Sequence, residues 1–245
     1  MESKWIAHGK ENNDARVNLL CFPYPGGSAN SFAKWKNKFN YNFNICPILY
    51  PMRERRRNEK MHESVEKLVE DLVISNKELF HKDFAIFGYC AGAAIGYEVA
   101  VKVKKLFGKE PIYFMAASAE LPNYAKKLPI SYEADEKEEV IKYLKSLGGY
   151  DEEILKSDTF QKYYLPIVIA DSKLFRNYIP SKPEDFNFDI DAVFGTKDKS
   201  ISTHKIKEWD KVSSGKFEMI EYDAGHYFVD EYLDCICNRI MKKTI

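Results

Sequence analysis

The sequence predicts an α/β fold in which a mostly parallel central sheet is flanked by helices. Short apolar runs of strand type alternate with segments whose apolar residues recur at helical spacing, an order typical of a parallel sheet covered on both faces. The chain has 245 residues, 45% of them hydrophobic, which is enough for one substantial core. No repeat, low-complexity tract or linker divides the sequence, so residues 1–245 are expected to form a single domain.

The predicted elements follow one another with turn signals between them. The first run, at residues 17–22, is almost wholly apolar and stops at a turn rich in Pro and Gly, as a buried strand does. Residues 91–107 are apolar nearly all round in their first half, which indicates a helix with a buried start. We predict strands at residues 17–22, 43–49, 84–88, 111–118, 191–195 and 217–222, and helices at residues 31–39, 64–79, 91–107 and 229–242.

Residues 121–183 break this alternation. The stretch is rich in charge and in helix-forming residues, with helical segments expected at 133–147 and 151–178, and it contains no convincing strand. We therefore predict a helical insertion within the domain. Its position after the fourth strand is where a lid over an active site would be built.

Composition argues against several classes of function. Lys and Arg number 37, as do Asp and Glu, so the formal net charge is zero and neither a nucleic acid nor a membrane is indicated as a partner. The N-terminus lacks the apolar run of a signal peptide, and no stretch approaches the ~18 apolar residues of a membrane helix, so a cytoplasmic location is expected. The five cysteines have no zinc-like spacing, which predicts free thiols and neither a metal nor another cofactor. Four of them are expected to be small buried hydrophobes, namely Cys21, Cys46, Cys235 and Cys237.

The segment Gly88-Tyr89-Cys90-Ala91-Gly92 carries the strongest chemical signal. It joins an apolar strand directly to an apolar helix and fits the G-x-S-x-G nucleophile elbow of the α/β-hydrolase fold, with Cys in the Ser position. The two glycines let strand and helix approach closely, and the helix N-terminus favours a thiolate. We predict that Cys90 is the nucleophile and that the N–H of Ala91 binds the oxyanion.

A nucleophile of this kind needs a base and an acid, which follow it in the order acid then His. His226 lies in a tight loop between a predicted strand and the closing helix. His204 lies in a polar stretch that is more simply interpreted as the solvated start of a helix. Asp198 stands at the turn after the strand at 191–195, and Asp223 is only three residues before His226 and would point elsewhere. We predict that His226 is the base and Asp198 the acid, although an Asp at such a position also serves as a turn or cap residue.

The second oxyanion donor is expected in the loop after the first strand. Pro23 and Pro25 have no N–H and cannot donate. We therefore predict that Tyr24 donates, with Gly26 as the next candidate, the alternative being that the segment is only a turn.

With these residues in place, the chain resembles the type II thioesterases, stand-alone α/β-hydrolases that accompany non-ribosomal peptide and polyketide synthetases. Seven segments are similar to motifs of that family. In the first part of the chain these are residues 22–28 (family motif F-P-H-A-G-G-S), 49–55 (L-P-G-R-x-x-R) and 87–93 (F-G-H-S-M-G-A). In the insertion and after it they are residues 147–155 (L-G-G-x-P-x-E-x-L), 165–171 (L-P-x-x-x-x-D), 195–198 (G-x-x-D) and 224–228 (G-G-H-F-F). The chain departs from the family at the nucleophile, where Cys90 replaces Ser. It also departs at Tyr24 and Pro25, which replace His and Ala, and at Tyr89 and Ala91, which replace His and Met.

The resemblance implies hydrolysis of acyl groups from the phosphopantetheine arm of an acyl or peptidyl carrier protein, which would dock near the insertion. It implies no cofactor, and a monomer is the default for this architecture. Because a thioester at Cys90 is more reactive towards amines than an oxygen ester, an acyltransferase or cyclising enzyme is the alternative. A catalytically inactive binding module is a third reading, against which the retained Cys90, Asp198 and His226 argue. The basic loop at residues 53–57 would contact the phosphate or an acidic carrier, or is simply a solvated surface loop.

Overall fold

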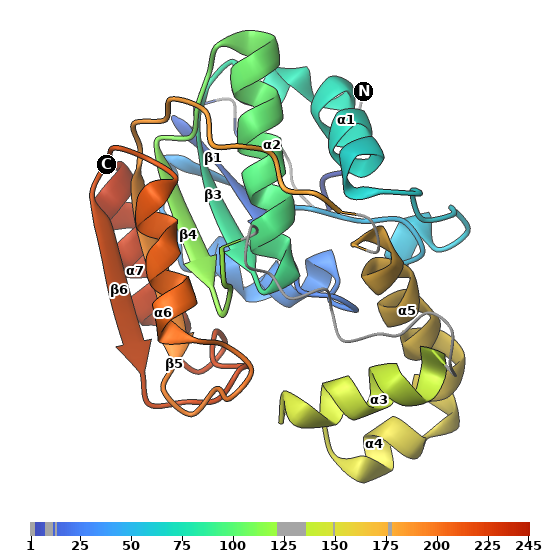
Figure 1. Cartoon of the computed structure of the whole chain (residues 1–245). Helices are drawn as coiled ribbons and strands as arrows, with labels where there is room; N and C mark the ends of the chain where they lie inside the picture. Colours follow the sequence, from blue (N-terminus) through green and yellow to red (C-terminus); the bar gives the residue numbers. More distant parts are fainter. Residues whose placement is uncertain (1–2, 8–11, 13, 122–135, 149, 176–177) are drawn as a thin grey trace.

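A six-stranded parallel sheet forms the centre of the protein, seen here in a computed structural model that describes residues 3–7, 12, 14–121, 136–148, 150–175 and 178–245 (Figure 1). The strand order is β2-β1-β3-β4-β5-β6, and each neighbouring pair is parallel. The strands are β1 Val17–Phe22, β2 Phe43–Pro47, β3 Asp83–Tyr89, β4 Tyr113–Ala117, β5 Asp189–Gly195 and β6 Phe217–Tyr222. Because the order reverses between β1 and β3, the loops that follow these two strands flank the crevice where open α/β sheets bind ligands.

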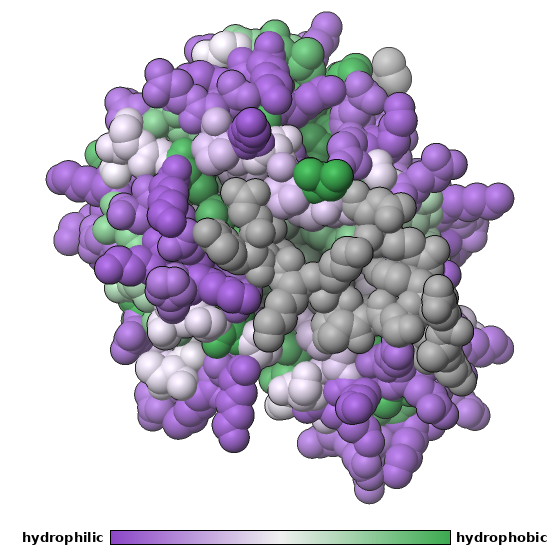
Figure 2. Space-filling model, viewed as in Figure 1, coloured by the Kyte–Doolittle hydropathy of each residue, from purple (hydrophilic) through white to green (hydrophobic). Residues whose placement is uncertain are grey.

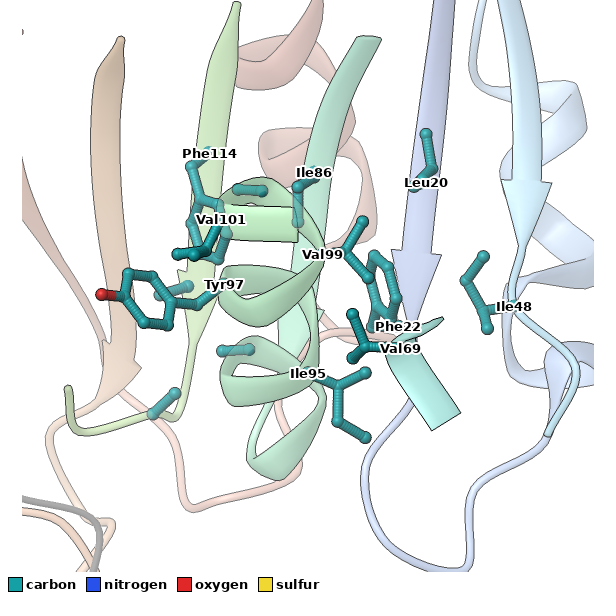
Figure 3. Packing of buried hydrophobic residues seen from close by; sticks show 14 of the residues in the cluster. Leu20, Phe22, Ile48, Val69, Ile86, Ile95, Tyr97, Val99, Val101 and Phe114 are labelled. Atoms are coloured by element: carbon teal, nitrogen blue, oxygen red, sulfur yellow. The ribbon is translucent and has the colours of Figure 1, made fainter. Parts of the chain in front are cut away.

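Helices cover both faces of the sheet. One face packs against α1 (Val65–Ser75), α2 (Ala91–Phe107) and the pair α6 (Thr203–Ile206) and η6 (Lys207–Lys211), and the other against η1 (Ala29–Asn37) and α7 (Leu233–Thr244). Two further short 3-10 helices are η2 (Glu54–Arg56) and η3 (Lys77–Phe80). Figure 3 shows Ile95 and Val99 of α2 directed towards Phe22 of β1, with Val69 of α1 beside them. Burial of such apolar side chains fixes α2, and with it the residue that precedes α2, against the sheet.

The insertion contributes α3 (Glu136–Ser146), α4 (Glu152–Lys156), the π-helical turn η5 (Phe160–Tyr164) and α5 (Leu165–Leu174), all between β4 and β5. Figure 1 places these helices beyond the ends of the strands to which the arrows point, that is, their carboxyl ends. They enclose a small apolar core of their own, formed by Val140, Leu144, Leu147, Leu155, Phe160, Leu165 and Val168. Residues 122–135, which include the start of the helix predicted at 133–147, lie outside the described residues.

All six predicted strands are confirmed, although some boundaries differ. The predicted helix at 151–178 is divided, since Pro166 lacks an N–H and stands in the first turn of a new helix, α5, directly after the π-helical turn. The closing helix begins at Leu233 rather than at residue 229, because Phe228 O accepts from the N–H groups of Glu231 and Tyr232 in a preceding turn. The predicted burial of Cys235 is wrong: Cys237 faces the sheet, and a residue two positions earlier on a helix points to a different side.

The described surface is largely polar on the face drawn in Figure 2. Hydrophilic residues make up most of this face, with hydrophobic side chains scattered among them. Within the ranges given above, no helix combines the length and the apolar character needed to cross a bilayer.

Candidate active site

Cys90 stands on a sharp turn between β3 and α2. Its φ is 53° and its ψ is −127°, a strained conformation for a residue with a side chain, and its N–H donates to Ala117 O at 2.8 Å. A Cβ on Gly88 would lie 2.3 Å from Ala93 Cα, and one on Gly92 would lie 2.4 Å from Phe22 O. Both positions therefore require glycine, and the close packing they allow leaves Cys90 half-buried at the N-terminus of α2.

His226 and Asp198 lie together in the loops that follow β6 and β5. His226 Nδ1 is 2.6 Å from Asp198 Oδ2, and both side chains are buried, at 2% and 1% exposure. Ser200 holds the other carboxylate oxygen, because its N–H and its hydroxyl donate to Asp198 Oδ1 at 2.9 and 2.6 Å. Among the described residues, the buried Nε2 of His226 has no hydrogen-bond partner, so this nitrogen is available to exchange a proton.

The backbone brings these two loops together. Lys197 N–H donates to Ala224 O at 2.9 Å, and a Cβ on Gly195 would lie 2.3 Å from that same oxygen. The rival residues are directed elsewhere. Asp223 is exposed and pairs with Lys197 at 2.8 Å, and His204 lies exposed on α6.

The charges of the site favour an imidazolium paired with anions. Burial lowers the pKa of His226, but the negative charge of Cys90 and the hydrogen bond to Asp198 outweigh burial and raise this pKa to about 10. Burial raises the pKa of Asp198, but the hydrogen bonds from His226 and Ser200 and the charge of His226 outweigh it and hold this pKa below its usual value. The arrangement can therefore deliver a proton from Nε2 to a leaving group and take one from an attacking water.

Two hydroxyl groups donate hydrogen bonds to the backbone carbonyl of His226, and neither role was predicted from the sequence. Tyr89 Oη donates to His226 O at 2.8 Å and accepts from Phe228 N at 3.1 Å. Ser118 Oγ, on a residue with a φ of 45°, donates to the same carbonyl at 3.0 Å. The only sequence signal for Tyr89 is its place beside the nucleophile, and Ser118 has none.

The loop after β1 forms a tight turn beside the elbow. Gly27 N–H donates to Tyr24 O at 2.8 Å, with Pro25 at the second position and Gly26 at a φ of 79° at the third, as a type II turn requires. Gly26 N–H donates to Asp171 Oδ2 at 2.7 Å. The N–H groups of Tyr24 and Ala91 have no acceptor among the described residues, so each is open to an oxyanion.

Tyrosines surround the nucleophile, some of them from the insertion. The Tyr227 ring lies 5.3 Å from that of Tyr24 and 5.8 Å from that of Tyr150, between centroids. Tyr143 of α3 approaches Cys90, and its pKa is raised by burial and by the negative charge on the sulfur. The helical period indicated α3, but no sequence pattern indicated that Tyr143 would reach Cys90.

The basic loop at residues 53–57 was expected either to contact a phosphate or an acidic carrier, or to be a solvated surface loop. Both interpretations are wrong for Arg53 and Arg56. Arg53 is buried and pairs with Asp171, and Arg56 is buried, pairs with Glu59 and lies 4.2 Å from the centroid of the Trp5 ring. Their guanidinium groups are committed to the fold and neither form a solvated loop nor face a phosphate. Within the described ranges, no three His, Cys, Asp or Glu side chains are grouped to hold a metal ion.

Comparison with known proteins gives consistent results along almost the whole chain. The family model for the thioesterase domain matches residues 17–244. Gramicidin S biosynthesis protein GrsT of Aneurinibacillus migulanus is 27% identical over 232 residues, which cover 94% of this chain and 89% of that protein. Thioesterase PikA5 of Streptomyces venezuelae is 26% identical over 237 residues, which cover 96% of this chain and 84% of that protein. The solved structure of the type II thioesterase BorB from the borrelidin biosynthetic cluster has a TM-score of 0.84 at 22% identity and 99% coverage of both chains, which confirms the predicted α/β-hydrolase fold.

Proposed function

The chain belongs to the thioesterase domain family, and from this we propose that it hydrolyses acyl groups from the phosphopantetheine arm of a carrier protein in non-ribosomal peptide or polyketide biosynthesis. We propose further that Cys90, His226 and Asp198 form its catalytic triad. The contact of 2.6 Å between His226 Nδ1 and Asp198 Oδ2, beside a strained elbow that carries Cys90, supports this assignment most directly.

In the first half of the proposed reaction, Cys90 Sγ attacks the thioester carbonyl and forms a new S–C bond. The carbonyl oxygen takes up negative charge and accepts hydrogen bonds from the N–H groups of Ala91 and Tyr24. The bond to the pantetheine sulfur then breaks, and His226 Nε2 gives its proton to the leaving thiol. Asp198 holds the imidazole in the required tautomer and stabilises its charged form.

In the second half, water attacks the acyl group on Cys90. His226 Nε2 takes the proton from the water as the oxygen forms a bond to the carbonyl carbon. Collapse of the tetrahedral intermediate releases the free acid and restores the thiolate and the imidazolium. The insertion helices lie beyond the carboxyl ends of the strands, the edge that Cys90 follows, so we propose that the carrier docks beside them and passes its arm to Cys90.

A second acceptor is a specific consequence of the sulfur nucleophile. Because an acyl thioester reacts more readily with amines than an oxygen ester does, Cys90 would also support transfer to an amine or to another thiol. The scaffold is that of a hydrolase family, which favours water. The choice of acceptor is the point at which this chain is expected to differ from relatives that carry Ser.

The test follows acyl groups by mass spectrometry. A carrier protein that bears an acyl group on its phosphopantetheine arm is incubated with the wild-type enzyme, with Cys90→Ala or with Cys235→Ala. Cys235→Ala is the control, since Cys235 is an exposed thiol on α7. We expect free acid and a transient acyl group on Cys90 with the wild type and with Cys235→Ala, and neither product with Cys90→Ala. Amide formed in the presence of an amine would establish transfer instead. Absence of both acid and adduct would leave only a binding module.

A further inference from the structure

A buried ion pair joins the insertion to the loop before η2. Arg53 and Asp171 are each 4% exposed, and the Arg53 guanidinium contacts both carboxylate oxygens of Asp171, with Nη1 at 3.1 Å from Oδ2. The two residues are 118 positions apart in sequence. Such a pair is costly to bury unless the remaining hydrogen-bonding positions are also satisfied, so the groups that complete it are informative.

Two of the groups that complete this pair belong to the turn at residues 24–27, and a third, Pro51 O, accepts from Arg53 Nε at 3.2 Å. Gly26 N–H donates to Asp171 Oδ2 at 2.7 Å, and Arg53 Nη1 donates to Gly27 O at 2.6 Å. Helix α5 also packs directly on the turn, since a Cβ on Gly26 would lie 2.6 Å from Val168 Cγ2. One peptide N–H and one peptide carbonyl of the turn are thus held by side chains from two other parts of the chain.

These bonds determine which N–H of the turn stays free. The N–H of Gly26 is used by Asp171 and that of Gly27 by Tyr24 O, and Pro25 has none. Of the N–H groups in the turn, that of Tyr24 is the one with no acceptor among the residues that the structure describes. A small cavity is lined by Tyr24, Ala91 and Asp171, among others, so Asp171 borders the same space as the residues of both proposed oxyanion donors.

We propose that Asp171 and Arg53 are positioning residues that hold the 24–27 turn in the geometry needed to stabilise the oxyanion, so that this turn and helix α5 of the insertion move together. The inference rests on the proposed function. Neither residue touches the substrate. Loss of the pair frees the Gly26 N–H and the Gly27 carbonyl, and the Tyr24 N–H then loses its fixed direction.

The test separates acyl transfer to Cys90 from simple reactivity of its sulfur. In Asp171→Asn, formation of acyl-Cys90 from an S-acyl-N-acetylcysteamine thioester is expected to slow about 10- to 100-fold in its maximal rate, the usual result of misplacing a catalytic group, with little change in apparent binding. Alkylation of Cys90 by iodoacetamide passes through no oxyanion and is expected to keep its wild-type rate. Arg53→Lys retains the charge but loses the planar fork, so an intermediate rate of acylation is expected.

Asp191→Asn is the matched control. Asp191 is a fully buried carboxylate whose Oδ2 lies 2.6 Å from Arg239 Nε. It lies near the start of β5 and has no contact with the 24–27 turn among the hydrogen bonds and ion pairs of the described residues. Its substitution is expected to lower stability and leave the acylation rate unchanged. The inference is overturned if Asp171→Asn and Arg53→Lys acylate at the wild-type rate, or if either variant loses alkylation and acylation in parallel. Failure of the proposed function is a different result, because the wild type itself would then form no acyl-Cys90.

Discussion

Removal of the Tyr89 hydroxyl is the sharpest test of how the elbow supports His226. In Tyr89→Phe, the buried Phe228 N–H loses its acceptor, which costs roughly 1–3 kcal/mol, whereas His226 O keeps the hydrogen bond from Ser118 and the lost partner costs about 0.5–1.5 kcal/mol. The free energy of unfolding is therefore expected to fall by about 1.5–4.5 kcal/mol. For a chain of this length that corresponds to a Tm lower by roughly 3–18 °C.

The same substitution is expected to lower kcat about 10- to 100-fold, because displacement of a catalytic group by about 1 Å has an effect of this size. Tyr113→Phe is the matched control, since Tyr113 is fully buried and its hydroxyl donates to Asp191, away from the loop of His226. That variant should lose roughly 1.5–3 kcal/mol and keep its kcat. Urea unfolding and hydrolysis of a thioester substrate measure both quantities. A Tyr89→Phe protein within about 0.5 kcal/mol of the wild type, or one with the kcat of Tyr113→Phe, would refute the reasoning.

Three further predictions concern Asp198 and Gly92. Asp198→Asn is expected to lower kcat by about 10³- to 10⁴-fold because the His226 tautomer is no longer fixed, while Asp223→Asn at the exposed rival position should match the wild type in the same assay. The pKa of Asp198 is lowered in the folded state, so the ionised carboxylate stabilises the fold at pH values above its unfolded pKa of about 3.9, and this contribution is lost as the pH falls through the folded pKa. The difference in unfolding free energy between the wild type and Asp198→Asn should therefore shrink below about pH 4. A difference that stays constant with pH would contradict this. Gly92→Ala should destabilise the protein by about 3 kcal/mol or more and remove activity, since its Cβ would meet backbone oxygens, whereas Gly108→Ala, which meets no atom within 4 Å, should cost about 1–2 kcal/mol for its φ of 64° and leave kcat unchanged.

The sheet could be predicted because parallel strands are buried on both faces and read as apolar runs bounded by turns. The same logic indicated Cys90, Asp198 and His226, each of which lies in the turn or loop after a strand. Asp198 and His226 meet at the carboxyl edge of the sheet because β5 and β6 are parallel neighbours, and Cys90 follows β3 at the same edge. The helix starts and ends were less certain, as at residue 229, because a turn and a first helical turn have similar local sequence requirements.

The contacts across long distances in sequence could not be predicted. Asp171 lies 145 residues from Gly26 and 118 from Arg53, and local patterns give no information on such pairings. Charge type was misleading for Arg53, since a cluster of arginines usually reads as a solvated surface. Tyr143 illustrates the same limit: the period of α3 indicates a helix, but only the packing of the insertion decides which of its side chains reaches the nucleophile.

The polar groups that the described structure leaves unpaired explain why the turn geometry matters for chemistry. Around the site, peptide groups of the 24–27 turn are bonded to Asp171 and Arg53, and the His226 carbonyl is bonded twice. The groups without a partner among the described residues include the Tyr24 N–H, the Ala91 N–H and His226 Nε2, and these three are the groups that an acyl transfer through Cys90 would use. None of these groups depends on whether the nucleophile is sulfur or oxygen. Water and an amine would therefore use the same groups, and the reactivity of the thioester at Cys90 is the feature expected to admit an amine.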